Sequence, residues 1–329
     1  TDSDVLDRAA SQGTKVSLDL TVTSAPLFGL IDKVLWPDAG IVNVLDYTSP
    51  RAVRRMHYME SLDADRVRGH LNITLQDDNT GWLPQVATQS IDLLLREMQR
   101  LKWQGFCTRS WPIGDLDPTV AYMARACWNR DTTPGAAYED HFCHAYGPEA
   151  KEDLCRVMRL LEDATILLDV DYFYLFFPVL GNMCRPFEYP EPMPVTLLHV
   201  RATYEQCRRI LVRQQGRITA SSGDDRLAYM IGRLDFAIGA LTEKQLLHEG
   251  CDAFHKAQDA GDDAAAREHT ALARDLFTRA VQTGEAALHA ASRVAHDTDH
   301  GCMVAYYHLF VRQVRERIAE MLQKIEPAK

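Results

Sequence analysis

The order of strand-like and helical runs in the first 130 residues limits the folds that this chain can adopt. Four short runs with strand patterning alternate with four longer runs with helical patterning. The strand-like runs are residues 15–23, 40–48, 68–78 and 105–111, and the helical runs are residues 24–36, 49–62, 87–103 and 115–128. Because strand-then-helix units are typical of parallel sheets with crossover helices, we expect residues 1–130 to form four βα units.

Helical patterning takes over in the rest of the chain. Apolar residues recur three or four positions apart over residues 132–147, 148–168, 195–214, 224–261, 262–296 and 300–325. Residues 172–195 are aromatic at first and then proline-rich, which predicts a long ordered loop. We therefore expect residues 131–329 to form an α-helical domain, with the domain boundary near residue 130.

Composition excludes several classes of partner and cofactor. A formal net charge of -10, without a long run of lysine or arginine, argues against binding to nucleic acid. No apolar run approaches the ~20 residues that a membrane helix needs, so we expect no membrane partner. The eight cysteines contain no CxxC pair, and neither GxGxxG nor GxxxxGK follows a strand-like run. We therefore predict no disulfide framework, no nucleotide and no other cofactor.

The third strand-like run is polar on one face and apolar on the other. Side chains alternate across a strand. One face of residues 68–78 carries Leu71, Ile73, Leu75 and Asp77, and the other carries Asn72, Thr74, Gln76 and Asp78. Residues 15–23 divide in the same way. Since a parallel sheet covered by helices on both sides is apolar on both faces, the polar faces predict a cavity instead of a second helix layer.

A (β/α)8 barrel explains such a polar face, because the apolar faces then meet the outer helices while the polar faces line a pocket at the carboxyl ends of the strands. The fold class that we predict is α/β: the C-terminal half of a (β/α)8 TIM-type barrel, strands five to eight, followed by an all-α helical domain. The N-terminal half would come from the same precursor or from another chain. An open, doubly wound sheet is the alternative. Residues 1–11, which are typical of the middle of a helix or loop, favour the barrel half.

Three stretches resemble parts of a known enzyme fold. They are DDNTGWLPQ (77–85), GFCTRSWPIGDLDPTVAYMARACWN (105–129) and TTPGAAYEDHFCHAYGPEAKEDL (132–154). They resemble the loop after the seventh strand, the last strand with its final helix, and the start of the trailing helical domain of a bacterial glycoside hydrolase barrel. The group concerned spans hexosaminidase-like and α-glucuronidase-like barrels. The resemblance covers about residues 15–165 and implies a carbohydrate substrate, but it transfers no catalytic pair, because the family's first four strands have no counterpart here.

Carboxylates at the predicted strand ends are the candidates for catalysis. Glycoside hydrolysis needs a proton donor and a second carboxylate that acts as nucleophile or base, roughly 5 to 9 Å apart. The candidates are Asp78, Asp46 and Asp77, and Asp78 ranks first because it lies on the polar face. Alternatively, Asp77 and Asp78 only turn the chain and cap the next helix, and Asp46 pairs with Arg51 or Arg109.

Side chains beside these carboxylates are candidates for substrate binding. Trp82 and Trp111 can stack on the apolar side of a pyranose, although tryptophans at strand ends are also ordinary packing residues. Arg109 either clamps the carboxylate of an acidic sugar with its planar guanidinium or pairs with an aspartate of the chain. Tyr47 and Gln76 complete the predicted set.

Two histidine clusters and three further tryptophans have structural interpretations. The clusters are His141, Cys143 and His144, and His296, Asp297, Asp299, His300 and Cys302. His296 and His300 have a spacing that suits zinc, but no glutamate general base of the HExxH kind accompanies them, and we predict no metal site. We expect Trp36, Trp103 and Trp128, in or beside helices, to be core residues.

Two functions from different classes remain open. The first is a glycoside hydrolase whose barrel rim carries the chemistry, which favours a periplasmic or extracellular location over a cytoplasmic one. The second is a non-catalytic half-barrel module that binds glycan or protein and needs a partner chain, because an isolated half-barrel has exposed sheet edges. A homo-oligomer is a further arrangement that both functions allow.

Overall fold

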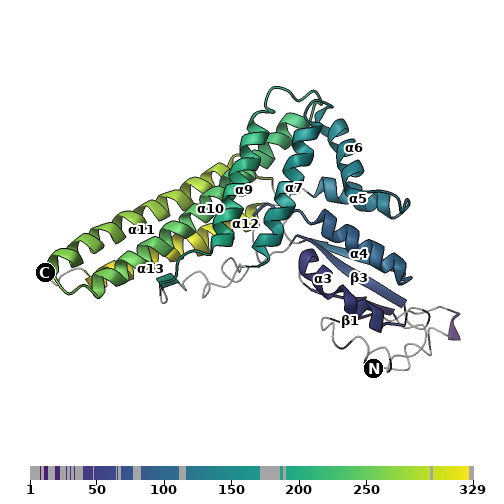
Figure 1. Ribbon diagram of the computed structural model, residues 1–329, viewed down its shortest axis with the longest axis horizontal. Helices are drawn as coiled ribbons and strands as arrows, with labels where there is room; N and C mark the ends of the chain where they lie inside the picture. The colour runs from purple at the N-terminus through teal and green to yellow at the C-terminus, as the bar shows by residue number, and fades with distance from the viewer. Residues whose placement is uncertain are drawn as a thin grey trace. The chain divides into compact units, whose positions relative to one another are not determined.

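The computed structural model describes residues 8, 11–13, 19–22, 27, 30, 33, 40–46, 48–63, 65, 68–76, 83–110, 116–170, 186–187, 190–296 and 299–325. Figure 1 labels the helices and strands, and most of the described residues are helical. The chain divides into two compact units. The first comprises Thr1–Leu75 and Ala87–Arg109, and the second comprises Gln76–Val86 and Ser110–Lys329.

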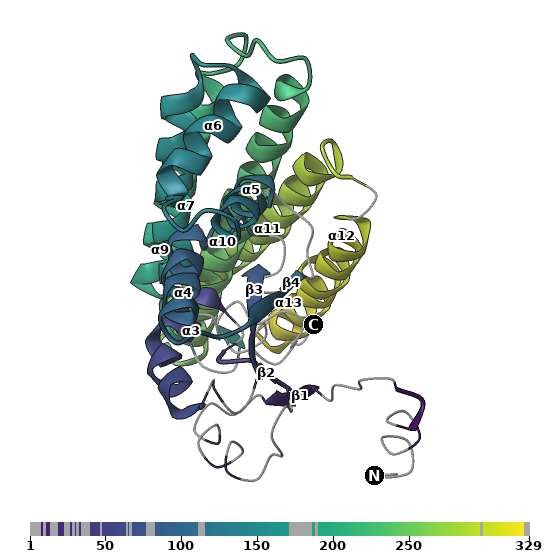
Figure 2. The ribbon, with the colours of Figure 1, turned by 90° about the vertical axis from the view of Figure 1, so that its right-hand side faces the viewer.

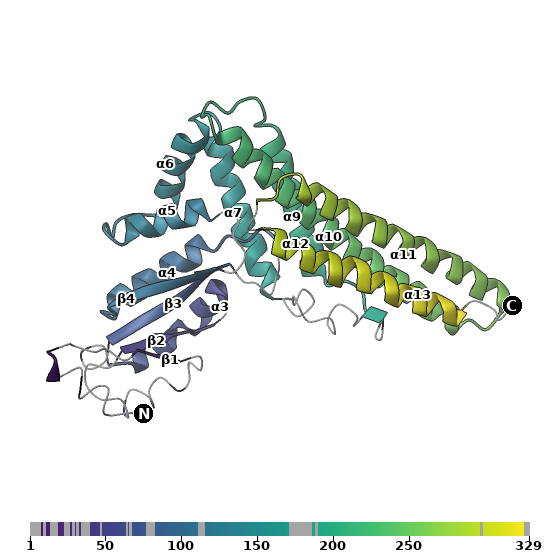
Figure 3. The same ribbon diagram turned by 180° about the vertical axis from the view of Figure 1, so that it is seen from behind.

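Four strands form one sheet in the order β1-β2-β3-β4 (Figure 2, Figure 3). The strands are β1 (Asp19–Val22), β2 (Gly40–Asn43), β3 (Arg68–Gln76) and β4 (Gly105–Ser110). β1 pairs with β2 and β2 pairs with β3, both in parallel, and Asn43 lies opposite Leu71. Each strand falls within a run predicted from the sequence, so the four predicted strands are confirmed. The barrel remains a prediction, since the described strands form a four-stranded sheet.

Two helices accompany the sheet, α3 (Ser49–Arg55) and α4 (Thr88–Arg100), and a 3-10 segment (Met56–Ser61) follows α3. The helix α3 begins where its sequence predicts, because Thr48 Oγ1 accepts a hydrogen bond from Arg51 N at 3.2 Å and a proline occupies the first turn. These helices pack against each other and contribute buried apolar side chains to the core of the first unit.

The connection from α4 to β4 is a tight C-terminal cap. Lys102 adopts a positive φ of 57°, and its N donates to Gln99 O at 3.2 Å. Trp103 N donates to Met98 O at 2.9 Å, which completes the Schellman pattern. The Trp103 ring then lies over Gly69 of β3, where a Cβ would approach the ring to 2.8 Å. Trp103 is therefore a core residue, as predicted.

The second unit is built from helices. They are α5 (Asp117–Ala126), α6 (Pro134–Tyr146), α7 (Lys151–Leu168), α9 (Val195–Val212), α10 (Gly223–Gln258), α11 (Asp263–Ser292), α12 (His300–Tyr306) and α13 (Gln313–Ile325), with a π-helical stretch at Tyr307–Arg312. The two longest, α10 and α11, run side by side (Figure 1), and α9 packs against both α7 and α10. These helices follow the periodicity predicted from the sequence.

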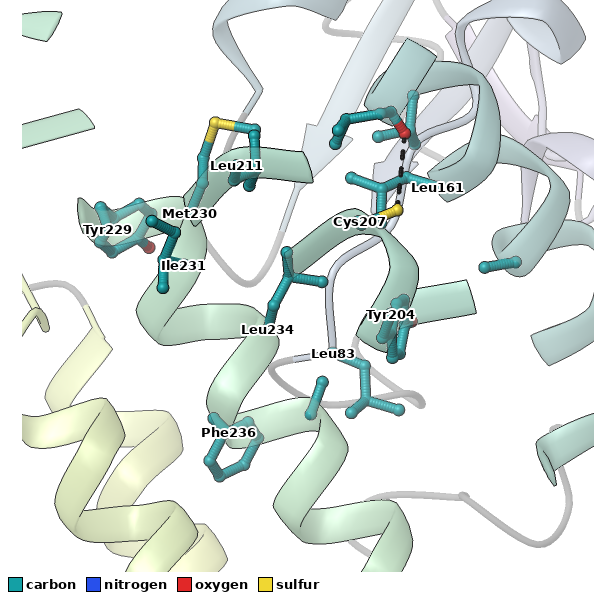
Figure 4. Packing of buried hydrophobic residues seen from close by; sticks show 14 of the residues in the cluster. Leu83, Leu161, Tyr204, Cys207, Leu211, Tyr229, Met230, Ile231, Leu234 and Phe236 are labelled. Atoms are coloured by element: carbon teal, nitrogen blue, oxygen red, sulfur yellow. Dashed lines mark hydrogen bonds between the residues drawn. The ribbon is translucent and has the colours of Figure 1, made fainter. Parts of the chain in front are cut away.

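The core of the second unit joins α7, α9 and α10. Figure 4 shows part of it, including Leu161 from α7, Cys207 from α9 and Leu234 from α10. The segment 83–86 belongs to this core. Tyr204 Oη donates to Pro84 O at 2.8 Å, and Val86 N donates to Thr165 Oγ1 at 2.8 Å. The helices thus fix the backbone that follows the predicted rim loop.

Close contact between α10 and α11 depends on small residues. A Cβ on Gly239 would lie 2.5 Å from the Cβ of Ala287, and one on Gly250 would lie 2.7 Å from the ring of Phe277. Glycine at these two positions therefore lets the helices approach. At its start, α11 is capped by Asp262, whose Oδ1 accepts hydrogen bonds from two backbone N–H groups at 2.9 and 2.8 Å.

Some expectations differ from the structure or fall outside it. Trp128 was expected in the core, but it lies beyond the last residue of α5 and is 92% exposed, so this prediction is wrong. The second compact unit contains Gln76–Val86 as well as the residues after Arg109, and α5 packs against α6 within it, while the domain boundary near residue 130 stays a prediction. Trp36 and most of the predicted loop 172–195 lie outside the described residues. Within the described part of the chain, no helix is both long and apolar enough to span a membrane.

Candidate functional site

Asp46 follows the carboxyl end of β2 and is held by two arginines of α3. Its Oδ1 lies 3.1 Å from Arg51 Nε, and its Oδ2 lies 3.2 Å from Arg55 Nε. The residue is only 9% exposed. A carboxylate in contact with two guanidinium groups forms two charge-assisted pairs, and these fix its orientation. The sequence allows a pairing of Asp46 with Arg51 or with Arg109, and the structure shows the pairing with Arg51.

Arg109, near the end of β4, contacts the polar face of β3. Its Nε donates a hydrogen bond to Thr74 Oγ1 at 2.8 Å. Ser49, the first residue of α3, donates from its hydroxyl to Thr74 O at 2.7 Å. Thr74 is itself buried, so the polar face of β3 is hydrogen-bonded and shielded from solvent at this position. The structure thus brings Arg109 to the face that the alternation pattern identified as polar.

Gln76, the last residue of β3, is 1% exposed and ties down the segment that follows. Its Nε2 donates to Gln85 O at 3.4 Å, which links the end of β3 to the described segment that begins at Leu83. Among the described residues, its Oε1 has no hydrogen-bond partner. Three of the predicted site residues, Asp77, Asp78 and Trp82, lie between Gln76 and Gln85 in the sequence and outside the described residues, as do Tyr47 and Trp111.

The second unit contains buried ionisable groups that were not identified from the sequence. Glu243 of α10 accepts a hydrogen bond at Oε2 from Tyr306 Oη at 2.5 Å. Its carboxyl fills the space over Gly284, where a Cβ would lie 2.5 Å from Glu243 Cδ. Burial raises the pKa of Glu243 to about 8, and burial lowers the pKa of the neighbouring Lys244 to about 8. Both pKa values lie close to physiological pH, so a small change in pH changes the charge of these two side chains.

The spacing of apolar residues along α10 contains a signal that predicts the burial of Glu243 and His248. Along α10, Glu243 continues a stripe of buried residues that includes Phe236 and Leu247, and His248 continues another that includes Leu241 and Cys251. A charged or imidazole side chain on a continuous apolar stripe of a helix is a candidate for burial.

His248 lies beside a cavity of about 320 Å³ in the second unit. Its Nδ1 is 2.6 Å from Glu191 O. Burial, followed by the charge of Lys244, lowers the pKa of His248 to about 4, so its imidazole is neutral at physiological pH. Across the described ranges, no group of three or more His, Cys, Asp or Glu side chains is placed to hold a metal ion.

The fold of the chain is similar to that of a glycoside hydrolase. The solved structure concerned is that of a GH138 enzyme targeting pectin rhamnogalacturonan II, which matches with a TM-score of 0.62 at 7% sequence identity. The match covers 98% of this chain and 58% of that chain, so this chain spans less than two thirds of the length of the structure it matches. No protein-family model matches the chain, and no curated protein matches it.

The comparison confirms the prediction of a glycoside hydrolase-like fold at the level of fold alone. The hexosaminidase-like and α-glucuronidase-like group and the barrel half stay predictions. The predicted site residues also stay predictions, with Asp46, Gln76 and Arg109 described in the structure and the other five outside it.

Proposed function

We propose that this chain is part of a carbohydrate-active glycoside hydrolase. The observation that carries the proposal is the similarity of fold to a glycoside hydrolase along 98% of the chain. On this proposal the four βα units are half of a (β/α)8 barrel, and the other half belongs to the same longer protein or to a partner chain. The carboxyl ends of the strands then form the catalytic face, as in other barrels of this type.

The polar surface at the strand ends supports this location. Arg109 and the buried Thr74 form a partly buried polar contact between the carboxyl-terminal parts of β4 and β3. Gln76, two residues beyond Thr74 on the same strand face, buries a carboxamide oxygen that has no hydrogen-bond partner among the described residues. Buried polar groups of this kind are costly unless they bind something, so they are suited to orienting sugar hydroxyl groups.

The three candidate carboxylates have different roles in the proposed reaction. Both carboxylate oxygens of Asp46 are already engaged by Arg51 and Arg55, so this residue is better suited to an electrostatic or positioning role. Asp78, with Asp77 beside it, supplies the carboxyl group that acts on the glycosidic bond. Its partner comes from the other half of the barrel, and the distance between the two decides whether configuration is retained or inverted.

The substrate class in this proposal is a plant or microbial glycan, bound by Trp82, Trp111, Tyr47, Gln76 and Arg109. The related structure is that of an enzyme targeting pectin rhamnogalacturonan II, so pectic glycans belong in the first panel of substrates. Arg109 favours an acidic sugar if its guanidinium reaches the substrate while Nε remains bound to Thr74.

Hydrolysis of nitrophenyl glycosides, nitrophenyl uronides and pectic glycans tests the proposal, with the intact longer protein or with the complex that supplies the other half of the barrel. The Asp78→Asn variant should abolish turnover while changing the free energy of unfolding by less than about 1 kcal/mol, because a carboxylate at the rim contributes little packing. Asp65→Asn, at an exposed aspartate of the first unit, is the matched control and should retain activity.

Full activity of Asp78→Asn would remove this residue from the mechanism. Binding of glycan without turnover of any substrate would favour the second function, a non-catalytic glycan-binding module.

A further inference from the structure

The helical unit contains a second cavity, of about 310 Å³, between α5, α6, α7 and α10. Its floor consists of buried side chains, those of Tyr146, Met158, Tyr229 and Met230. These residues offer an apolar and partly aromatic surface. The volume lies at the lower end of the range of about 300–1,000 Å³ that is usual for small-molecule sites, so the cavity suits a ligand the size of one sugar ring.

One wall of the cavity is an aromatic stack held in place by a buried carboxylate. The rings of Tyr229 and His296 are parallel, with centroids 4.3 Å apart and planes at 5°. Tyr229 Oη lies 3.2 and 3.1 Å from the two carboxylate oxygens of Asp299. Asp299 Oδ2 also accepts a hydrogen bond from His296 N at 2.9 Å. Because Asp299 contacts both residues and is buried, it fixes the exposed His296 ring against the tyrosine.

The rim of the cavity is polar and slightly acidic. Asp117, Asp225 and Arg226 line it and are exposed, and Arg226 Nη1 lies 2.6 Å from Asp117 Oδ2. The two carboxylates and the one guanidinium of the rim give it a formal charge of -1. Burial lowers the pKa of His141, the half-buried histidine of the wall, which keeps its imidazole neutral. A ligand with a negative charge therefore meets a net acidic rim whose one cation already contacts a carboxylate.

We propose that this cavity is a binding site for one neutral pyranose unit of a glycan. A pyranose has an apolar C–H face and a ring of hydroxyl groups that both donate and accept hydrogen bonds. The floor and the Tyr229–His296 stack match the apolar face, since aromatic side chains offer a large apolar surface with a polar edge. The carboxylates and the guanidinium of the rim, together with the imidazoles of the wall, can exchange hydrogen bonds with the hydroxyl groups. The site is additional to the proposed hydrolytic residues and takes no part in bond cleavage.

Ligand-observed NMR titration of the full chain tests the proposal. The probes are methyl pyranosides of glucose, galactose, mannose, rhamnose and N-acetylglucosamine, together with the methyl glycosides of glucuronate and galacturonate. We expect at least one neutral pyranoside to bind, and to bind more tightly than the uronates. His296→Ala should weaken this binding by about tenfold because it removes half of the stack, and Asp225→Asn should weaken it by about tenfold because it removes a charged acceptor.

Two control variants make the same chemical changes away from the cavity. Asp224→Asn changes the exposed neighbour of Asp225 in the same first helical turn, and His289→Ala removes an exposed histidine of α11. Both should bind the pyranoside as the wild type does, and thermal unfolding checks that all four variants are folded. The proposal is overturned if no neutral pyranoside binds, if the uronates bind more tightly, or if the cavity variants bind as the controls do.

Hydrolysis assays distinguish a failure of this binding-site proposal from a failure of the proposed function. Asp225→Asn should leave turnover of a nitrophenyl monoglycoside unchanged, whereas Asp78→Asn should leave pyranoside binding in the helical unit unchanged. Loss of turnover in Asp225→Asn would show that the cavity takes part in catalysis and would contradict the proposal. Absence of hydrolysis in every form of the protein, with binding retained, would contradict only the proposed enzyme activity.

Discussion

Replacing Glu243 by glutamine should change how the stability of the helical unit depends on pH. In the folded chain burial raises the pKa of Glu243 from 4.5 to about 8, in spite of the hydrogen bond from Tyr306. Between these two pH values the folded state holds a proton that the unfolded state has lost. Unfolding therefore becomes easier as the pH rises through this range. Glutamine keeps the shape and an acceptor for the tyrosine hydroxyl, but it does not titrate.

The magnitude follows from the neighbouring groups. Each group that binds one more proton in one state than in the other changes the free energy of unfolding by about 1.4 kcal/mol per pH unit. The pKa of His248 is lowered from 6.5 to about 4, so its effect has the opposite sign and offsets that of Glu243 below pH 6.5. From pH 6.5 to about 8 Glu243 is the dominant group, and His248 and Lys244 offset it only at the two ends of this range, so the free energy of unfolding should fall by about 1 kcal/mol.

Lys244 sets the behaviour at higher pH. Burial lowers its pKa from 10.5 to about 8, so the folded state disfavours its charged form. Above pH 8 the unfolded state holds the additional proton, and stability should rise again as the pH increases. The wild type should therefore be least stable near pH 8, whereas Glu243→Gln should show no fall between pH 6.5 and this minimum.

Urea unfolding followed by far-UV circular dichroism measures this difference at a series of pH values. Glu268→Gln, at an exposed glutamate of α11, is the matched control and should follow the wild type. Parallel curves for the wild type and Glu243→Gln between pH 6.5 and 8 would refute the reasoning, since they would show that Glu243 is not protonated in the folded chain.

Three further substitutions test contacts within the helical unit. Tyr306→Phe removes the hydrogen bond that favours the charged form of Glu243, so pH titrations of stability should show the fall extending to higher pH than in the wild type. Gly250→Ala places a Cβ 2.7 Å from the Phe277 ring and should lower the free energy of unfolding by about 1–3 kcal/mol in urea titrations, whereas an unchanged value would show that the ring moves aside. Asp262→Ala removes the cap of α11 and should cost about 1 kcal/mol in the same assay; no loss would mean that water replaces the cap.

Local pattern was sufficient to predict the described strands and the long helices. Alternation and turn residues placed all four strands, and the three-to-four spacing placed helices as long as α10. The ion pair of Asp46 with Arg51 was one of two pairings considered, because the residues are close in sequence and α3 begins between them. Trp128 was misplaced because its sequence continues the pattern of α5, whereas the helix ends at Ala126 and the indole extends into solvent.

Contacts between distant residues were beyond the reach of local pattern. Glu243 and Tyr306 meet only because α10 and α12 lie in one helical unit, and a glutamate within a helix is usually expected to be solvated. The two histidine clusters were considered separately as metal ligands, yet one member of each, His141 and His296, lines the same cavity. Arg109 and Thr74 likewise come together through the pairing of two strands.

The anchoring of residues 83–86 has a consequence for anyone who shortens this chain. The strand-rich part looks like a natural fragment to express, but Val86 and Pro84, which follow Asp77, Asp78 and Trp82 in the sequence, are hydrogen-bonded to Thr165 of α7 and Tyr204 of α9. A fragment without these helices would lose both hydrogen bonds to residues 84 and 86. Engineering of this chain should therefore retain α7 and α9 together with the strands, and random mutagenesis for altered activity should include both helices as targets.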